Sequence, residues 1–260
     1  MSDEPVLYSS EGAIATVTIN RPDRRNAINP AVVEGISRAL SEADENSDIG
    51  VVVLTGEGDR AFCAGGDLGG MAVDAGKVAE HFSRAAVGDL FEQMRALRLP
   101  VVARVNGHAL AGGFGLMLAC DLVVAAADAE FGMPEIDIGL WPFMISAVVQ
   151  RDLPRKVALE LMMTGRRMDA EEASQWGIVN SVVHRDDLDG AVQELASSLA
   201  SKSPLIASLG KSSYYRVEDM AFRDALDYLS GMLTLCLESE DTVEGVTAFI
   251  EKRSPSWKAR

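Results

Sequence analysis

Short β-branched runs alternate along this chain with longer stretches in which apolar residues recur at helical spacing. Continuous apolar runs stand at 49–55 and 122–126, and such runs are typical of strands buried on both faces. A short β-branched run of Val101, Val102 and Val105 predicts a further strand. Between them, 33–43 and 77–97 carry apolar residues every three or four positions, which predicts amphipathic helices. The order strand–helix–strand–helix–strand favours right-handed crossovers and therefore an α/β fold.

The two ends of the chain differ from this middle part. Alternating residues at 6–8 and 13–19, separated by Glu11-Gly12, predict a β-hairpin, and Asn29-Pro30 is typical of a helix start. From residue 144 onward the pattern is mostly helical, with helices expected over 154–163, 170–176, 188–201, 222–237 and 242–252, and one last strand over 178–183. We therefore expect an α/β core over 1–200 and a helical region over 201–260.

Charge and cysteine usage exclude several classes of protein. A net charge of −15 disfavours nucleic acid or an anionic membrane as the main partner, although a few basic groups suffice for a small anionic ligand. Cys63, Cys120 and Cys236 are odd in number and widely spaced, which indicates reduced thiols in a cytoplasm-like compartment and no metal site. The sequence shows no secretory signal pattern and no apolar run of about 18 residues. We expect a cytoplasmic protein without metal or cofactor.

Two glycine-rich stretches follow apolar strands. In the first, Ala111-Gly112-Gly113 opens an apolar helix, whose unpaired N–H groups and dipole favour negative charge. The second spans 56–70 and reads G-E-G-D-R-A-F-C-A-G-G-D-L-G-G. Neither is a phosphate-binding P-loop, and Gly113-x-Gly115 lacks the third glycine of a dinucleotide fingerprint. The glycines either permit close packing, or they direct two N–H groups at one carbonyl oxygen.

A few polar residues are candidates for chemistry, each with a plainer alternative. Glu135 follows a proline among apolar neighbours, so it is either a surface carboxylate or a proton carrier with a raised pKa. For Asp67 we favour a structural role in its loop. Arg24 and Arg25 either aid solubility or contact a phosphate. For His108 we favour packing in a loop.

Several motifs together resemble the crotonase superfamily, also called the enoyl-CoA hydratase/isomerase family. The resemblance extends over nearly the whole chain, from N-R-P-D-R-R-N-A-I-N (20–29) to F-I-E-K-R (249–253). It is carried by A-F-C-A-G-G-D (61–67), N-G-H-A-L-A-G-G-F-G-L (106–116), C-D-L (120–122) and F-G-M-P-E-I (131–136). It implies a spiral of ββα units, a helical C-terminal region that trimerises, and a homotrimer or dimer of trimers.

The resemblance also implies an acyl-CoA thioester substrate and a role for individual residues. Ala64 and Gly112 would donate the N–H groups of an oxyanion hole, and Glu135 would be the catalytic carboxylate. The residues expected to lie along coenzyme A are Arg25, Ala27, Gly65, Gly66, Asp67, Leu68, Phe249 and Lys252. Trp141 and Phe143 are expected to shape the acyl pocket. Coenzyme A enters as part of the substrate.

One departure from the family pattern bears on the reaction. Family hydratases carry a second glutamate three residues after the oxyanion glycine, and that position here is Gly115. A single carboxylate can move a proton from one carbon to another, whereas adding water also requires a water that is held and activated. We therefore favour isomerase-type proton transfer by Glu135 over hydration, with Phe143 crowding the place of the missing group. Hydration, acyl-CoA decarboxylation, thioester hydrolysis and non-catalytic acyl-CoA binding remain alternatives.

Overall fold

The computed structural model describes residues 4–67 and 77–259, with the backbone alone over 77–84. Its larger sheet has the strand order β1-β2-β3-β5-β7-β10. Strand β1 forms the expected antiparallel hairpin with β2, and all other neighbours in this sheet are parallel. The strands are β1 (Val6–Glu11), β2 (Ile14–Ile19), β3 (Val51–Gly56), β5 (Val101–Val105), β7 (Leu122–Ala126) and β10 (Ser181–Val183).

A smaller sheet of three-residue strands has the order β4-β6-β8-β9. These strands are β4 (Ala61–Cys63), β6 (His108–Leu110), β8 (Glu130–Gly132) and β9 (Arg167–Asp169). Each of β4, β6 and β8 follows a strand of the larger sheet within a few residues and precedes a helix, so the chain repeats a ββα unit. This is the crotonase-type spiral that the resemblance implied. The hydrophobic pattern alone missed β4, β6 and β9, because three residues are too few to show a period.

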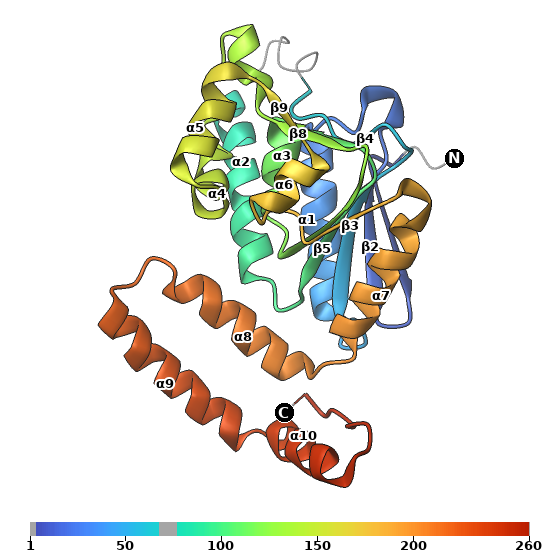
Figure 1. Ribbon diagram of the computed structural model, residues 1–260, viewed down its shortest axis with the longest axis vertical. Helices are drawn as coiled ribbons and strands as arrows, with labels where there is room; N and C mark the ends of the chain where they lie inside the picture. Colours follow the sequence, from blue (N-terminus) through green and yellow to red (C-terminus); the bar gives the residue numbers. More distant parts are fainter. Residues whose placement is uncertain (1–3, 68–76, 260) are drawn as a thin grey trace.

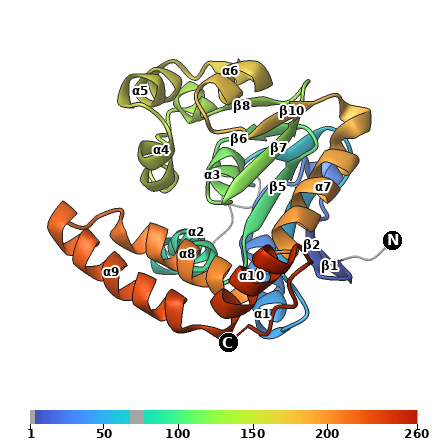
Figure 2. The ribbon, with the colours of Figure 1, turned by 60° about the horizontal axis from the view of Figure 1, so that its bottom comes forward.

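Helices cover both faces of the larger sheet, as Figures 1 and 2 show. On one face Val51 and Val53 of β3 pack with α7 (Leu188–Ala200). Val52 and Leu54 belong to the larger core on the other face, together with residues of α1 (Pro30–Glu45), α2 (Lys77–Ala96) and α3 (Gly112–Leu118). Successive strand residues point to opposite faces, so a strand covered on both sides must be apolar throughout.

The start of α1 agrees with the sequence prediction. Asn29 caps the helix by accepting a hydrogen bond from the Val32 N–H at 2.9 Å, and Pro30 occupies the first helical position. Such a cap contributes about 1 kcal/mol to stability. The cap fixes the point at which the loop of residues 20–29 ends and the helix begins.

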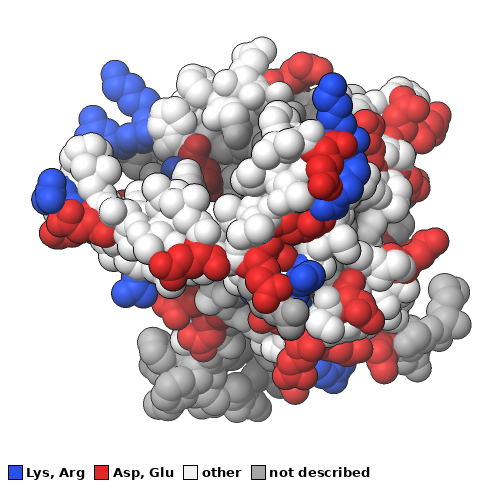
Figure 3. Space-filling view, turned by 90° about the horizontal axis from the view of Figure 1, so that it is seen from below, with Lys and Arg blue, Asp and Glu red and all other residues white. Residues whose placement is uncertain are grey.

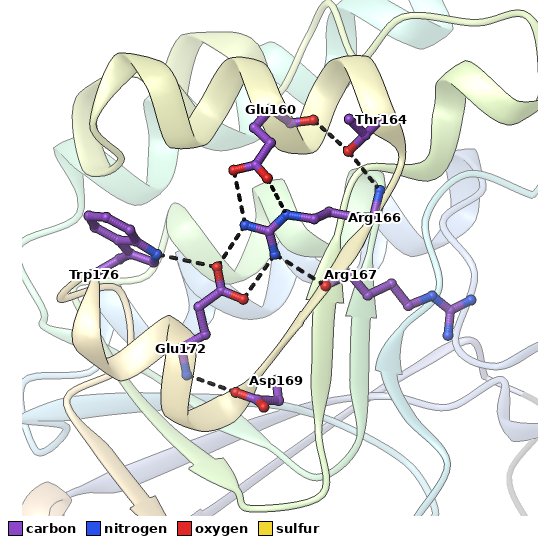
Figure 4. A network of polar contacts seen from close by, with 7 residues as sticks. All are labelled: Glu160, Thr164, Arg166, Arg167, Asp169, Glu172 and Trp176. Carbon is purple, nitrogen blue, oxygen red and sulfur yellow. Dashed lines mark hydrogen bonds and ion pairs between the residues drawn. The ribbon is translucent and has the colours of Figure 1, made fainter.

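A polar network centred on Arg166 joins three short elements beside the smaller sheet (Figure 4). Arg166 pairs with Glu160 of α5 (Arg155–Thr164) and, at 2.7 Å, with Glu172 of α6 (Ala170–Gln175). Asp169 caps α6 by accepting from the Glu172 N–H at 2.8 Å. The network holds the end of α5 in place, and α5 packs against the 3-10 turn Pro134–Ile138 that carries Glu135.

The last helices form an arm that extends from the sheets at the bottom of Figure 1. It consists of α8 (Pro204–Val217), α9 (Phe222–Glu238) and α10 (Glu240–Glu251). Asp121 anchors the arm, accepting hydrogen bonds from Lys211 Nζ at 2.7 Å and from the Tyr215 hydroxyl at 2.8 Å. The sequence predicted α9 and α10 but missed α8, whose pattern is interrupted by Gly210 and three serines. Helix α7 ends at Ala200, and our division of the chain after residue 200 stays a prediction.

The arm leaves large apolar side chains uncovered. Figure 3 views it from below and shows uncharged surface broken mainly by acidic groups. More than half of the residue's surface is exposed at Leu233, Leu235, Leu237, Val243, Val246, Phe249 and Ile250. None of the helices among the described residues is long and apolar enough to cross a membrane.

Candidate active site

Two loops meet where neighbouring strands of the smaller sheet end. Strands β4 and β6 are parallel, so their carboxyl ends lie at the same edge. Residues 64–67 follow β4, and Ala111 and Gly112 follow β6. A Cβ placed on Gly112 would lie 3.7 Å from the Gly66 amide nitrogen, and one placed on Gly65 would lie 3.2 Å from the Gly112 amide nitrogen. The two glycine-rich stretches singled out in the sequence are therefore in contact.

The backbone hydrogen bonds show which amides at this edge are free. The Ala64 N–H donates to the Arg25 carbonyl oxygen at 3.0 Å, so it is not available to a ligand. Among the described residues, the N–H groups of Gly66 and Gly112 have no acceptor. Our assignment of Ala64 as an oxyanion donor is therefore corrected: the free amide next to Gly112 belongs to Gly66. The parallel bridge between Ile28 and Gly66 uses the Gly65 carbonyl and the Asp67 N–H, which leaves the Gly66 N–H unpaired.

The turn before Gly112 has an uncommon backbone conformation. Ala111 has φ 51° and ψ −127°, and its N–H donates to the Gly132 carbonyl oxygen at 2.8 Å. Gly65 has φ +96°, and a Cβ there would lie 2.6 Å from the Ala111 methyl carbon. Strained backbone of this kind costs of order 1–3 kcal/mol and persists only where surrounding contacts enforce it. At this edge it allows the two free amides to approach each other.

The loop of residues 20–29 is fastened to the glycine loop. Arg21 forms an ion pair with Asp67 at 2.7 Å and donates to the Ala27 carbonyl oxygen at 2.6 Å. Asp67 thus has the structural contact that we favoured from its sequence position. Ala27 is buried, and Arg25 is exposed with φ 51°. Leu68, which we also expected beside coenzyme A, lies outside the described residues.

Arg25 lines a basic cavity of about 490 Å³. Arg60, which precedes β4, lies in the same lining, and neither guanidinium has an ion-pair partner among the described residues. His108 also lines the cavity; it lies in β6 and not in the loop that we expected, and its Nδ1 accepts from the Glu130 N–H at 3.2 Å. Arg167, Arg185, Asp59, Asp128 and Gly107 complete the lining. Four arginines and two aspartates give it an excess of positive charge in an acidic protein.

Glu135 lies in the 3-10 turn after β8 and is partly buried. Its Oε2 is buried and has no hydrogen-bond partner among the described residues. Burial raises the pKa of the Glu135 carboxyl above its ordinary value, and a backbone hydrogen bond offsets only part of this rise. A carboxylate in such surroundings holds a proton more readily than one in water.

The place of the second carboxylate is filled by an aliphatic side chain. A Cβ on Gly115 would lie 2.2 Å from Cγ2 and 2.5 Å from Cβ of Ile145, which is buried. We had expected Phe143 to crowd this place, but 77% of its surface is exposed, and Ile145 is the residue that fills it. Trp141 lines a separate cavity beside α4 (Ser146–Asp152) and α5, together with Arg155 and Met162.

The C-terminal residues expected to close over coenzyme A lie far from these loops in the same chain. Phe249 is 85% exposed, and Lys252 ends α10 with φ 55°. Figure 1 places α10 at the bottom of the molecule and β4 near the top, along its longest axis. Within a single chain, Phe249 and Lys252 therefore do not contribute to the site formed by Gly66 and Gly112.

Comparisons with known proteins agree with this fold. A model of the enoyl-CoA hydratase/isomerase family matches residues 9–260. A probable enoyl-CoA hydratase of Mycobacterium bovis, echA8, is 35% identical over 264 residues, covering 100% of both chains. A carnitinyl-CoA dehydratase of Proteus mirabilis is 35% identical over 261 residues, covering 97% of each. An enoyl-CoA hydratase structure from Bacillus anthracis has a TM-score of 0.93 at 30% identity, covering 98% of this chain and 100% of that one.

The chain belongs to the enoyl-CoA hydratase/isomerase family. It has the crotonase fold and is an enzyme acting on acyl-CoA.

Sequence reasoning missed two residues of this region. Ile145 gave no signal, because its contact with Gly115 exists only once α4 has folded onto α3. Arg60 stood within the second glycine-rich stretch, where we weighed the glycines and passed over the arginine. The sequence offered no signal for it, since the start of β4 fixes where its side chain begins and β4 was itself missed.

The Glu135 carboxyl predicts a stability effect. Since the folded state raises its pKa, folding favours the protonated form, and stability falls as pH rises from the ordinary carboxyl range through the raised pKa. Glu135→Gln removes this loss, so we expect its stability relative to the wild type to increase as pH rises above the ordinary glutamate pKa of about 4.3. Urea unfolding at several pH values measures the difference. Glu194→Gln, on the exposed face of α7, is the control; an equal pH dependence in both variants would contradict the prediction.

Proposed function

We propose that this enzyme isomerises the double bond of an enoyl-CoA, with Glu135 carrying the proton. The thioester oxygen accepts hydrogen bonds from the Gly112 N–H and the Gly66 N–H, the latter in place of Ala64. A preorganised donor aimed at a developing oxyanion contributes about 3–4 kcal/mol to the transition state. Binding the oxygen in this way favours the enolate, which lowers the barrier to proton transfer at carbons conjugated with the carbonyl.

The observation that carries this proposal is the lone carboxylate. Glu135 has a buried oxygen without a partner, and Ile145 occupies the space beside Gly115 where a second acid–base group would stand. In isomerisation, the base removes a proton from one carbon, the electron pair forms the enolate, and the same proton returns to another carbon. No water, metal or redox group takes part, and coenzyme A remains bonded to the acyl group.

Hydration is the second candidate. The relatives named above are a probable hydratase and a dehydratase, and both reactions use the same stabilised enolate. Decarboxylation and thioester hydrolysis on this scaffold, and acyl-CoA binding without catalysis, are alternatives that the same assay separates.

The deciding assay incubates purified protein with a 3-enoyl-CoA and, separately, with a 2-enoyl-CoA. We expect conversion of the first to the conjugated isomer to exceed hydration of the second, as followed by product identity. Glu135→Gln should lower kcat by at least about 100-fold, since a positioned acid–base group contributes 10²–10⁴-fold, while acyl-CoA affinity stays within a few-fold. Faster hydration than isomerisation, or turnover that survives in Glu135→Gln, would contradict the proposal.

For the rest of coenzyme A, we propose that the basic cavity lined by Arg25 and Arg60 receives phosphate groups of the nucleotide. Arg25 lies in the loop of residues 20–29, whose Ile28 pairs with Gly65 and Gly66, so a ligand can extend from the free amides toward this cavity. The two unpaired guanidiniums match the charge and donor geometry that phosphate requires.

Arg60→Ala should therefore raise KM for acyl-CoA by about tenfold, the loss of roughly one charge-assisted hydrogen bond. KM for a pantetheine thioester, which lacks the nucleotide phosphates, should not change, and neither should kcat. Arg38→Ala on the exposed surface of α1 is the matched control. If Arg60→Ala weakens both substrates equally, the cavity is not the nucleotide site.

The third part of the proposal is the assembly, a homotrimer or a dimer of trimers formed by the arm. Its support is the uncovered apolar surface of α9 and α10, because large exposed apolar patches mark protein–protein interaction sites. Assembly would also bring Phe249 and Lys252 of one chain to the coenzyme A of another.

Light scattering on the purified protein should give three or six times the chain mass of 27.8 kDa. Leu233→Glu on α9 should reduce the mass, because a carboxylate at a buried contact is strongly unfavourable. Gly190→Glu, which adds the same charge on α7, should not. A single-chain mass for the wild type would overturn this part alone.

A further inference from the structure

The structure leaves no room for a side chain at Gly115. Its φ lies outside the left-handed region, so its backbone conformation suits any residue. An added Cβ would lie 2.2 Å from Cγ2 and 2.5 Å from Cβ of Ile145, far inside van der Waals contact. The obstructing atoms sit at the branch of the isoleucine, next to its backbone, so rotation of a flexible end does not relieve the contact.

Ile145 is held firmly in this position. It stands directly before α4, and its carbonyl accepts hydrogen bonds from the N–H groups of Val148 at 3.1 Å and Val149 at 2.9 Å. Its side chain is only 3% exposed and belongs to the main core. The Ile145 side chain therefore lies against α3 in a fixed position, and it forms a wall beside Gly115.

The position of Gly115 on α3 relates its contact with Ile145 to the proposed reaction. Residues three apart on a helix share a face, so Gly115 lies one turn beyond Gly112 on the same side. A long polar side chain at position 115 would project from the face whose N-terminal amide binds the thioester oxygen. Such a group could hold a water molecule beside the acyl carbons, and Ile145 covers the place from which it would project.

We propose that Ile145, together with Gly115, determines the reaction specificity of the site: its side chain excludes a second acid–base group and the water that such a group would hold. This rests on the proposed oxyanion site and proton transfer by Glu135. With the Ile145 side chain present, a proton that Glu135 takes from the substrate returns to the substrate. With the Ile145 side chain removed and a carboxylate at position 115, water adds across the double bond. Its hydroxyl goes to one carbon and its proton to the other.

The geometry defines a pair of double variants that differ by one methyl group. Gly115→Glu with Ile145→Gly removes both close atoms, and the nearest remaining atom, Cα of residue 145, lies 3.5 Å away. Gly115→Glu with Ile145→Ala keeps the Cβ atom at 2.5 Å. We expect the Gly115→Glu, Ile145→Gly double variant to hydrate a 2-enoyl-CoA with a kcat/KM at least about 100-fold above the wild type. This is the lower end of the range for one positioned acid–base group. The Gly115→Glu, Ile145→Ala double variant should show no such gain in hydration.

A single variant provides a test that does not require a new carboxylate to be accommodated. During isomerisation in D₂O, Ile145→Gly should raise deuterium incorporation into the product several-fold over the wild type, because water reaches the opened wall. Ile145→Val, which keeps Cβ and Cγ2, should resemble the wild type. Circular dichroism establishes that each variant is folded; if neither double variant folds, the deuterium measurement decides.

The outcomes separate this inference from the proposed function. If the wild type isomerises no 3-enoyl-CoA, the proposed function fails, whereas the gain of hydration in the first double variant is still measured against the wild type. If that folded variant hydrates no faster than the wild type, or if Ile145→Gly leaves deuterium incorporation unchanged in an active enzyme, the role of Ile145 is overturned.

Discussion

The parallel pairing of β4 with β6 is the constraint on which the site depends. Parallel strands end at a common edge of the sheet, so the residues that follow the two strands lie close together. Here those residues are Gly66 and Gly112, whose amides point away from the backbone ladder. The strain at Ala111 and the absence of a Cβ at Gly65 are the local conditions under which the two loops come close enough. The proposed binding of the thioester oxygen depends on that approach.

The long elements of this fold could be predicted from hydrophobic period because each buries a full face. Strand β3 was predicted from its unbroken apolar run, and α1 from its spacing together with Asn29-Pro30. The short strands β4, β6 and β9 could not be predicted from that pattern, because pairing with neighbours, and not their own sequence, makes them strands. Helix α8 was missed for a related reason: a polar anchor at Asp121 fixes it, and a helical apolar period cannot report such an anchor.

The same distinction holds for the candidate site. Glu135 was predicted because the apolar character of its neighbours is visible in the sequence, and the structure buries its Oε2. The choice between Ala64 and Gly66 depends on one hydrogen bond between segments almost forty residues apart, which no local pattern encodes. Ile145 required a packing contact between two helices thirty residues apart. Motifs located the loops, and only the three-dimensional arrangement showed which atoms are free.

Asp121 has a wider consequence through its position at the start of β7. One carboxylate accepts from the Val101 N–H at the beginning of β5, from Lys211 and from Tyr215. The direction of the arm is thus set by a few polar contacts at the rim of the sheet, while the core beneath is set by apolar packing. Because the same carboxylate also holds the start of β5, a substitution at Asp121 disturbs the edge of the sheet and the arm together. The attachment of the arm is therefore coupled to the strand beneath it, and the two cannot vary independently.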